Sequence, residues 1–365
     1  MNEFRPGLEG VVAFETHIAE PDREGGALRY RGVDIEELVG RVPYEKVWGL
    51  LVDESLEPGM PEPDEFVLEN VTGNAPSDLQ SATARLSAQW GLRKLVDIDD
   101  LQARDDLARL SATMMSIVAQ SARGPGMEPV PDDVVAQGET AAEKFLLRWR
   151  GDADPRHVKA IDTYWICTAE HGLNASTFTA RIVASTGADC AAAMSSAVGA
   201  LSGPLHGGAP ARVLPMLDEV AAMGDSERYV HDLLDRNERI MGFGHRVYRA
   251  EDPRARLLRQ TARELGSPRV EVAEELERVA LEELSRRHPE RVLATNVEFW
   301  SAVVLDVAQI PPALTPAMFA CARVAGWSAH ILEEKRTGKL IRPSARYVGP
   351  PSRPLSEVGG APVVT

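Results

Sequence analysis

The sequence has few basic residues relative to acidic ones, and it has few cysteines. Its formal net charge of −15 excludes the broad basic surface that wrapping a nucleic acid or binding an anionic lipid surface requires. An anionic ligand would therefore need a local cluster of basic side chains. The cysteines lie far apart in apolar stretches and have neither CxxC nor Cys/His metal-ligand spacing: Cys167, Cys190 and Cys321. We expect buried thiols in a reducing compartment and no metal site.

The chain also lacks a long apolar run. The most apolar stretch, residues 190–201, is rich in Ala, Ser and Gly and falls well short of the roughly 18 apolar residues of a membrane helix. The N-terminal stretch MNEFRPGLEGVVAFETH has no charged leader followed by an apolar run and a small-residue cleavage site. We therefore expect no membrane segment, and a cytoplasmic location.

What the sequence does contain is helical periodicity over most of its 365 residues, with 44% hydrophobic and 26% charged residues. Few stretches alternate apolar and polar residues as a half-buried strand would. The periodicity predicts a mainly α-helical globular fold with a large core. Helices are predicted at 100–122, 134–150, 155–170, 176–185, 209–223, 226–239, 270–287, 295–309 and 315–334, and a loop at 57–74.

His206 lies in the segment LSGPLHGGAP, just ahead of the helix predicted from residue 209. The positive end of a helix dipole disfavours imidazolium, so a histidine placed there stays neutral and can donate a hydrogen bond to a carbonyl oxygen. The alternative is a turn histidine that only caps the helix. The local pattern leaves both interpretations open.

His245 follows Gly242, Phe243 and Gly244 in MGFGHRVYRAEDPRA. Glycines allow a ligand to approach the backbone closely, and arginines offer forked donors to carboxylate or phosphate. The arginines that follow are Arg246, Arg249, Arg254 and Arg256. The segment matches neither a dinucleotide fingerprint nor a P-loop. It fits an anion-binding site, or equally the solvated basic start of a helix.

Glu298 interrupts the apolar and aromatic stretch TNVEFWSAVVL. Burying an unpaired carboxylate is costly and raises its pKa, which makes the ionised form a stronger base. The alternative is a glutamate that points to water or pairs with an arginine.

His171 precedes a polar stretch and a predicted helix in AEHGLNASTFTARIV. Asn174 or Ser176 could cap that helix, so local structure explains much of this motif. His171 by itself stays ambiguous.

In their order along the chain, these segments resemble the citrate synthase family from near the N-terminus to about residue 349. The resemblance rests on GLEGVVAFETHIAE followed by GALRYRGVDIEEL, and on HGLNASTFTAR, GPLHGGAP, GFGHRVYRAEDPR and RPSARYVG. It implies a large helical domain, residues 1–207 plus 310–365, and a smaller inserted helical domain, residues 208–309. The active site would lie in the cleft between them. The family resemblance also implies a simple homodimer, since the extra N-terminal domain of the hexameric, NADH-regulated branch is not found here.

The resemblance implies three catalytic residues. His206 would hydrogen-bond the thioester carbonyl of an acyl-CoA, Glu298 would remove the α-proton, and His245 would polarise the 2-oxo carbonyl of oxaloacetate. A carboxylate with an ordinary pKa of about 4.3 is a weak base toward a carbon acid, so the developing oxyanion must be stabilised. Neither a metal nor a redox cofactor is implied, because the CoA thioester is a substrate.

The resemblance also implies the binding residues. Oxaloacetate would be held by His171, Arg254 and Arg323, and Arg342 would reach the partner subunit's site. CoA would lie along Gly242, Phe243, Gly244 and Arg246.

This chain departs from the family pattern at NVEFWSA, where Asp, Tyr and Gly usually occupy the third, fifth and seventh positions. Glu298 in place of Asp moves the carboxylate by about one carbon–carbon bond, and a displacement near 1 Å can lower the rate on the order of a hundredfold. Pro210 also stands where Asn is common. The expected activity is citrate synthase; the alternatives are 2-methylcitrate synthase, which uses propionyl-CoA, and a weakly active paralogue that senses acyl-CoA or oxaloacetate.

Overall fold

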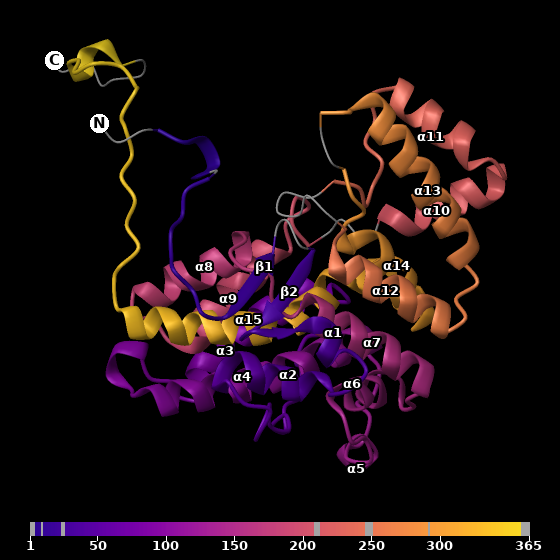
Figure 1. Cartoon of the computed structure of the whole chain (residues 1–365). Helices are drawn as coiled ribbons and strands as arrows, with labels where there is room; N and C mark the ends of the chain where they lie inside the picture. Colours follow the sequence, from indigo (N-terminus) through magenta and orange to yellow (C-terminus); the bar gives the residue numbers. More distant parts are fainter. Residues whose placement is uncertain are drawn as a thin grey trace.

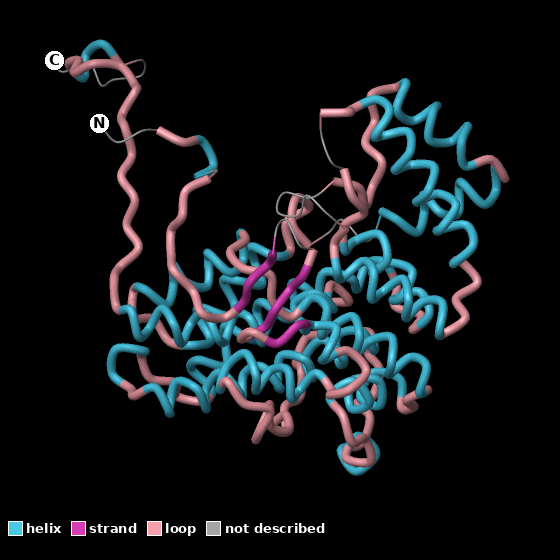
Figure 2. The backbone as a smooth tube through the Cα atoms, viewed as in Figure 1, coloured by secondary structure: helices cyan, strands magenta, loops and turns pink. Residues whose placement is uncertain are grey.

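The computed structural model describes residues 4–8, 10–22, 26–207, 212–244, 251–290 and 293–358. Figures 1 and 2 show a mainly helical molecule, as the sequence predicted. Its α-helices are α1 (Ile35–Leu38), α2 (Tyr44–Asp53), α3 (Ala75–Gln89), α4 (Asp100–Arg123), α5 (Asp132–Val135), α6 (Ala141–Arg150), α7 (Pro155–Thr168), α8 (Ala175–Ser185), α9 (Cys190–Leu201), α10 (Val213–Met223), α11 (Ser226–Asp235), α12 (Pro253–Glu264), α13 (Val270–Arg287), α14 (Val297–Val307) and α15 (Thr315–Thr337).

A small antiparallel sheet precedes the helices. Its strands are β1 (Ala19–Asp22), β2 (Ala27–Tyr30) and β3 (Val33–Asp34), in the order β1-β2-β3. Ala19 pairs with Tyr30, and Tyr30 also pairs with Val33. Strands this short carry too little alternation to be recognised from periodicity. Tyr30 points into the core, where it is fully buried.

Several predicted helices agree closely with the structure, and α13 has the predicted bounds. The helix predicted at 134–150 is wrong in its first half, because the chain forms α5 and then restarts at α6. The restart is a capping box: the Thr140 side chain accepts from the Glu143 N–H, and the Glu143 side chain accepts from the Thr140 N–H. The predicted loop at 57–74 contains no helix or strand.

Helix α15 runs through the centre of the large helical body (Figure 1). It packs against α2, α3, α4, α7, α8 and α9 and is buried along almost its whole length. A helix surrounded in this way is expected to be apolar on every side. Arg323 and His330 are therefore exceptional, because both are charged or polar residues buried on this central helix.

Helices α10, α11 and α13 pack together at one side of the molecule, and α12 and α14 lie between this group and α7 (Figure 1). All five helices fall within residues 208–309. The division into two domains at these boundaries stays a prediction. Helices α12 and α14 pack against α7, so residues from both parts of the chain meet there.

Candidate active site

His206 lies in the turn after α9, where its backbone N–H donates to the Gly203 carbonyl at 2.9 Å. Its Nε2 atom is 2.9 Å from the Ser176 Oγ and accepts from the Ser176 backbone N–H at 3.4 Å. A backbone N–H can only donate, so Nε2 must be unprotonated and the ring proton is assigned to Nδ1. This arrangement leaves Nδ1–H as a donor for a ligand.

Burial, together with the positive charge of Arg323, lowers the pKa of His206 to about 4. The imidazole is therefore neutral near pH 7. The sequence predicted a neutral imidazole on the basis of a helix dipole, but in the structure the causes are burial and the charge of Arg323. Residues 208–211 lie outside the described part of the chain, and α10 begins only at Val213.

Ser176 is held by two further groups. Asn174 caps α8, with its Oδ1 accepting from the Thr177 N–H, and the same oxygen lies 2.9 Å from the Ser176 Oγ. From α15, the Trp327 indole N–H donates to the Ser176 Oγ at 3.3 Å. Thus α8 and α15 together fix the partner that sets the tautomer of His206. Of the two capping candidates in this motif, Asn174 is the one that caps.

Arg323 extends from α15 into the same region and is 3% exposed. Its guanidinium lies 4.8 Å from the centre of the Phe319 ring, and the His206 ring contacts the same phenyl group. Within the described ranges, its Nε and Nη1 atoms have no hydrogen-bond partner. Burial lowers the pKa of Arg323, as expected for a guanidinium removed from water. A buried cation with unused donors is a binding site for an anion.

Arg254 is the second buried arginine, near the start of α12. Asp252 caps this helix and accepts from Arg254 Nε at 2.9 Å and from Nη2 at 2.7 Å. The positive charge of Arg254 also depresses the pKa of Arg323, so the two guanidinium groups lie close enough to interact. The structure therefore brings the guanidinium groups of Arg254 and Arg323 within electrostatic range of each other, with Arg323 also acting on His206.

Glu298 lies in the first turn of α14, where the Asn296 side chain caps the helix and accepts its N–H at 3.0 Å. Burial raises the pKa of Glu298 to about 7; Arg254 opposes this shift and Asp252 adds to it. These influences place Glu298 beside the Asp252–Arg254 pair. Near pH 7, about half of the molecules would carry an ionised Glu298. A pKa close to the working pH suits a general base.

The glycine-rich segment before His245 forms backbone hydrogen bonds with the residues just before α14. The Gly244 N–H donates to the Ala294 carbonyl at 2.8 Å, and the Asn296 N–H donates to the Gly242 carbonyl at 2.9 Å. Gly242 has φ +89°, and a Cβ there would lie 2.7 Å from the Cβ of Phe299. Packing and backbone conformation therefore require this glycine. A role for Gly242, Phe243 and Gly244 in CoA binding stays a prediction.

The remaining predicted residues lie in loops or outside the described ranges. His171 is half-buried in the loop between α7 and α8. Arg342 is exposed on the segment after α15, which runs away from the helical body (Figure 1). At 1.5 Å per residue the end of α15 is about 21 Å from Arg323, so Arg342 does not join the site of its own chain. His245, Arg246 and Pro210 lie outside the described residues.

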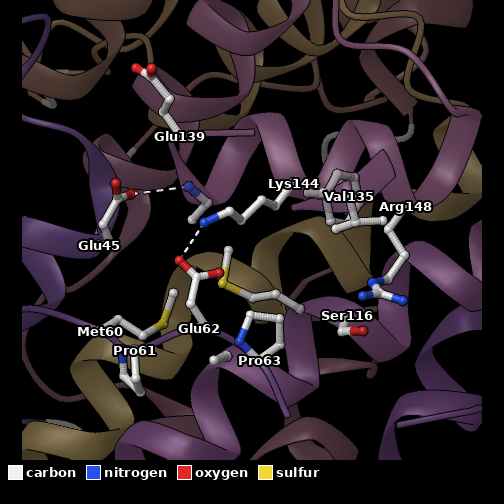
Figure 3. Close-up of a pocket in the computed structure, with 14 residues that line it drawn as sticks. Glu45, Met60, Pro61, Glu62, Pro63, Ser116, Val135, Glu139, Lys144 and Arg148 are labelled. Atoms are coloured by element: carbon white, nitrogen blue, oxygen red, sulfur yellow. Dashed lines mark hydrogen bonds and ion pairs between the residues drawn. The ribbon is translucent and has the colours of Figure 1, made fainter. Parts of the chain in front are cut away.

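A separate hollow lies between α2, α4, α5 and α6 (Figure 3). Its walls include Met60, Met115 and Phe145, and Lys144 pairs with Glu62 at its side. None of the predicted site residues lines it. This hollow is not the site that the sequence motifs describe.

Within the described part of the chain, no helix combines the length and apolar character needed to cross a membrane. The same ranges contain no group of three His, Cys, Asp or Glu side chains placed to hold a metal ion. The cysteines are buried and free, as predicted.

Comparison with known proteins agrees with this architecture. The family model described as "Citrate synthase, C-terminal domain" matches residues 7–344. A Mycobacterium tuberculosis protein named "Putative citrate synthase 2" is 59% identical over 358 residues, covering 98% of this chain and 96% of that protein. The 2-methylcitrate synthase of Shewanella oneidensis is 31% identical, with 94% of each chain covered.

Among solved structures, the citrate synthase of Thermoplasma acidophilum, in a ternary complex with carboxymethyl coenzyme A and oxaloacetate, has a TM-score of 0.83. It is 28% identical, and the match covers 98% of this chain and 100% of that one. The helical fold is thus that of a family of condensing enzymes. The chain belongs to the citrate synthase family.

Proposed function

We propose that this enzyme condenses acetyl-CoA with oxaloacetate and water to give citrate and CoA. The observation that carries the proposal is Arg323, a buried guanidinium with unused donors beside His206 and Arg254. Unused guanidinium donors of this kind suit a small dicarboxylate. The Thermoplasma acidophilum structure, which holds oxaloacetate and a coenzyme A analogue, supports the choice of ligands.

Oxaloacetate would be held by its two carboxylates. Arg323 and Arg254 would each donate to a carboxylate, and His171 would complete the site. The carboxylate of Asp252 already accepts two hydrogen bonds from Arg254, which fixes the orientation of the guanidinium group. His245 would donate to the 2-oxo oxygen and polarise that carbonyl.

The acyl-CoA would place its thioester oxygen at the Nδ1–H of His206. Glu298, as the carboxylate, would take a proton from the carbon next to the thioester, and His206 would stabilise the enolate oxygen. The enolate carbon would then attack the polarised carbonyl, forming the new carbon–carbon bond while the carbonyl oxygen gains a proton. Water would hydrolyse the thioester and release CoA as the thiol.

The choice of acyl group is the second candidate function. A 2-methylcitrate synthase is among the relatives, and it would use the same motifs with propionyl-CoA. One added methylene changes binding in an apolar pocket by only about 1–3 kcal/mol, so one enzyme can accept both substrates. Glu298 in place of the usual Asp makes the acyl preference of this chain a necessary measurement.

We also propose where the enzyme acts, how it assembles and how its site closes. The enzyme would act in the cytoplasm as a homodimer, with Arg342 on its projecting segment reaching the partner subunit's site. Closure of residues 208–309 over the remaining chain would bring Glu298 toward His206 and exclude water. The backbone of residues 242–244, with Arg246, would lie along CoA, and no metal or redox cofactor would take part.

CoA release, followed with a thiol-reactive dye, tests the proposal. The full-length enzyme is given acetyl-CoA or propionyl-CoA, each with and without oxaloacetate. Oxaloacetate-dependent release is expected, with the larger kcat/KM for acetyl-CoA. A larger value for propionyl-CoA would establish the methylcitrate reaction instead. Binding of both ligands without any release would overturn the catalytic proposal and favour a sensor.

A further inference from the structure

Glu170 is a buried carboxylate in the loop between α7 and α8, directly before His171. It is fully buried, although nothing in the reaction outlined above uses it. Burying a carboxylate without a compensating role is costly. The contacts around Glu170 show how its position is fixed and toward which group its charge acts.

The backbone of Glu170 is held on both sides by Tyr30 of β2. The Tyr30 hydroxyl donates to the Glu170 carbonyl at 3.1 Å and to the Ile166 carbonyl at 2.9 Å, and it accepts from the Glu170 N–H at 3.3 Å. Tyr30 is itself fully buried. The small sheet therefore anchors the loop that carries both Glu170 and His171.

The side chain of Glu170 lies against α15. Its Oε1 is 3.2 Å from the Nε2 of His330, and its Oε2 occupies the space that Gly326 leaves open. A Cβ at Gly326 would lie only 2.1 Å from that oxygen. Arg323, Gly326, His330 and Glu334 follow one another at helical spacings of three and four, so they share one face of α15.

His330 is fixed in turn by a third buried arginine. Arg181 of α8 lies 3.0 Å from His330 Nδ1, and it pairs with Glu334 at 2.8 Å and Glu333 at 2.7 Å. Arg181 is 1% exposed. A connected series of polar contacts thus runs from Arg181 through His330 to Glu170, and none of these residues belongs to the substrate contacts assigned above.

Glu170 acts electrostatically on Arg323. Burial lowers the pKa of Arg323, and Glu170 is the strongest of the groups that raise it again. Burial also acts to raise the pKa of Glu170, but His330 and Arg323 more than offset this, and its pKa falls below the ordinary value. Each of the two charges therefore favours the ionised form of the other. Glu170 Oε2 has no hydrogen-bond partner within the described ranges, and it lies at Gly326, one helical turn from Arg323 on the same face of α15.

We propose that Glu170, anchored by His330, Tyr30 and the space at Gly326, is a positioning residue that orients Arg323 and His171 toward the carboxylates of the 2-oxo acid. This inference rests on the proposed function, because it takes oxaloacetate as the ligand of Arg323. It adds to that function a second layer of residues that determines affinity for the dicarboxylate without touching it.

The direction in which oxaloacetate affinity changes distinguishes a positioning role for Glu170 from a purely electrostatic one. Removing a negative charge beside an anion site would by itself tighten binding of a dianion. Loss of orientation acts the other way, since misplacing a charged donor by about 1 Å can cost on the order of a hundredfold. For Glu170→Gln we therefore expect a KM for oxaloacetate that is about tenfold to a hundredfold higher, with the KM for acyl-CoA changed by less than about twofold.

The experiment compares full-length wild type, Glu170→Gln, Glu170→Asp and His330→Gln. Steady-state kinetics give kcat and both KM values, and calorimetry with oxaloacetate alone gives its Kd. Glu170→Asp keeps the charge and is expected to restore part of the affinity. His330→Gln leaves the charge of Glu170 in place but weakens the contact that fixes its side chain. The KM for oxaloacetate is expected to rise by about threefold to tenfold. This variant serves if Glu170→Gln does not fold.

The matched control is Asp78→Asn, which neutralises another buried carboxylate, bonded to Thr72 and Ser121 and outside the site. It is expected to lower Tm without changing either KM. A KM for oxaloacetate in Glu170→Gln that is unchanged or lower would overturn the positioning role. Since calorimetry reads binding without turnover, wild type that binds oxaloacetate but releases no CoA would count against the reaction alone.

Discussion

His206 is held between α8 and α15, whereas Glu298 lies on α14 beside α12, and burial acts on both side chains. It lowers the pKa of the His206 imidazole to about 4 and raises the pKa of the Glu298 carboxyl to about 7. Both groups are thereby shifted toward their neutral forms. The imidazole becomes a hydrogen-bond donor that carries no charge at neutral pH, and the carboxyl becomes a stronger base once it ionises.

The same two shifts link stability to pH in opposite directions. The pKa of His206 is lower in the folded state, so its contribution is present above its ordinary value of 6.5 and is lost as pH falls toward about 4. The pKa of Glu298 is higher in the folded state, so its contribution is present below 4.5 and is lost as pH rises toward about 7. In the weakly acidic range, lowering the pH therefore weakens the contribution of His206 to folding stability and strengthens that of Glu298.

The largest expected effect comes from removing the base. Glu298→Gln keeps the shape of the side chain but cannot accept the α-proton, so kcat is expected to fall by about a thousandfold to ten-thousandfold. CoA release from acetyl-CoA with saturating oxaloacetate measures the change. The Kd for oxaloacetate should stay near the wild-type value. A kcat within tenfold of wild type would show that another group removes the proton.

The second-largest effect is expected from removing the hydrogen-bond donor, His206. His206→Ala is expected to lower kcat by about a hundredfold to a thousandfold, because the developing oxyanion loses its hydrogen bond. Ser176→Ala is the comparison: it removes the hydroxyl but keeps the backbone N–H that fixes the ring tautomer, so a loss of less than about tenfold is expected. Equal losses in the two variants would mean that the hydroxyl, and not the backbone, sets the tautomer.

Moving the base is expected to matter less than removing it. Glu298→Asp withdraws the carboxylate by about one carbon–carbon bond, and we expect kcat to fall by about tenfold to a hundredfold. The reason is that the pairing of residues 294–296 with 242–244 fixes where α14 begins, which leaves the shorter side chain no compensating shift. A rise in kcat for Glu298→Asp would instead show that the native glutamate is misplaced for acetyl-CoA.

The smallest of these effects is the pH dependence of the wild type. Glu298 must be ionised to act as a base, so kcat/KM for the acyl-CoA should fall about tenfold per unit as pH drops below about 7. The residual activity of Glu298→Gln should lack this acid limb. A wild-type profile that is flat between pH 5 and pH 7 would contradict the assignment of Glu298 as the base.

The sequence predicted the mainly helical fold because amphipathic periodicity persists over long segments such as α13. It failed at the restart before α6, where capping by Thr140 outweighs the apolar pattern, and it did not show the sheet that carries Tyr30. His206, Arg254 and Glu298 could be singled out from their local segments, whereas Arg323 was implied only by the family resemblance. Their physical state could not be predicted, because it depends on neighbours that are distant in the chain.

Glu170 illustrates the same limit. It stands in a motif that the sequence analysis had already selected, but its neighbours there are capping residues that explain the motif locally. Only the fold brings it to Gly326 and His330, more than 150 residues later in the chain. A signal did exist in α15, where Arg323, Gly326 and His330 recur on one helical face, but without a partner segment it could not be interpreted.

The hydrogen bond from the Trp327 indole to Ser176 has a practical consequence. Indole fluorescence responds to changes in the polarity and hydrogen bonding of its surroundings, and this buried ring is one hydroxyl away from His206. Arrival of a thioester at the histidine would disturb that hydroxyl and therefore the emission of Trp327. The molecule thus contains its own optical reporter, placed where the first chemical step would begin.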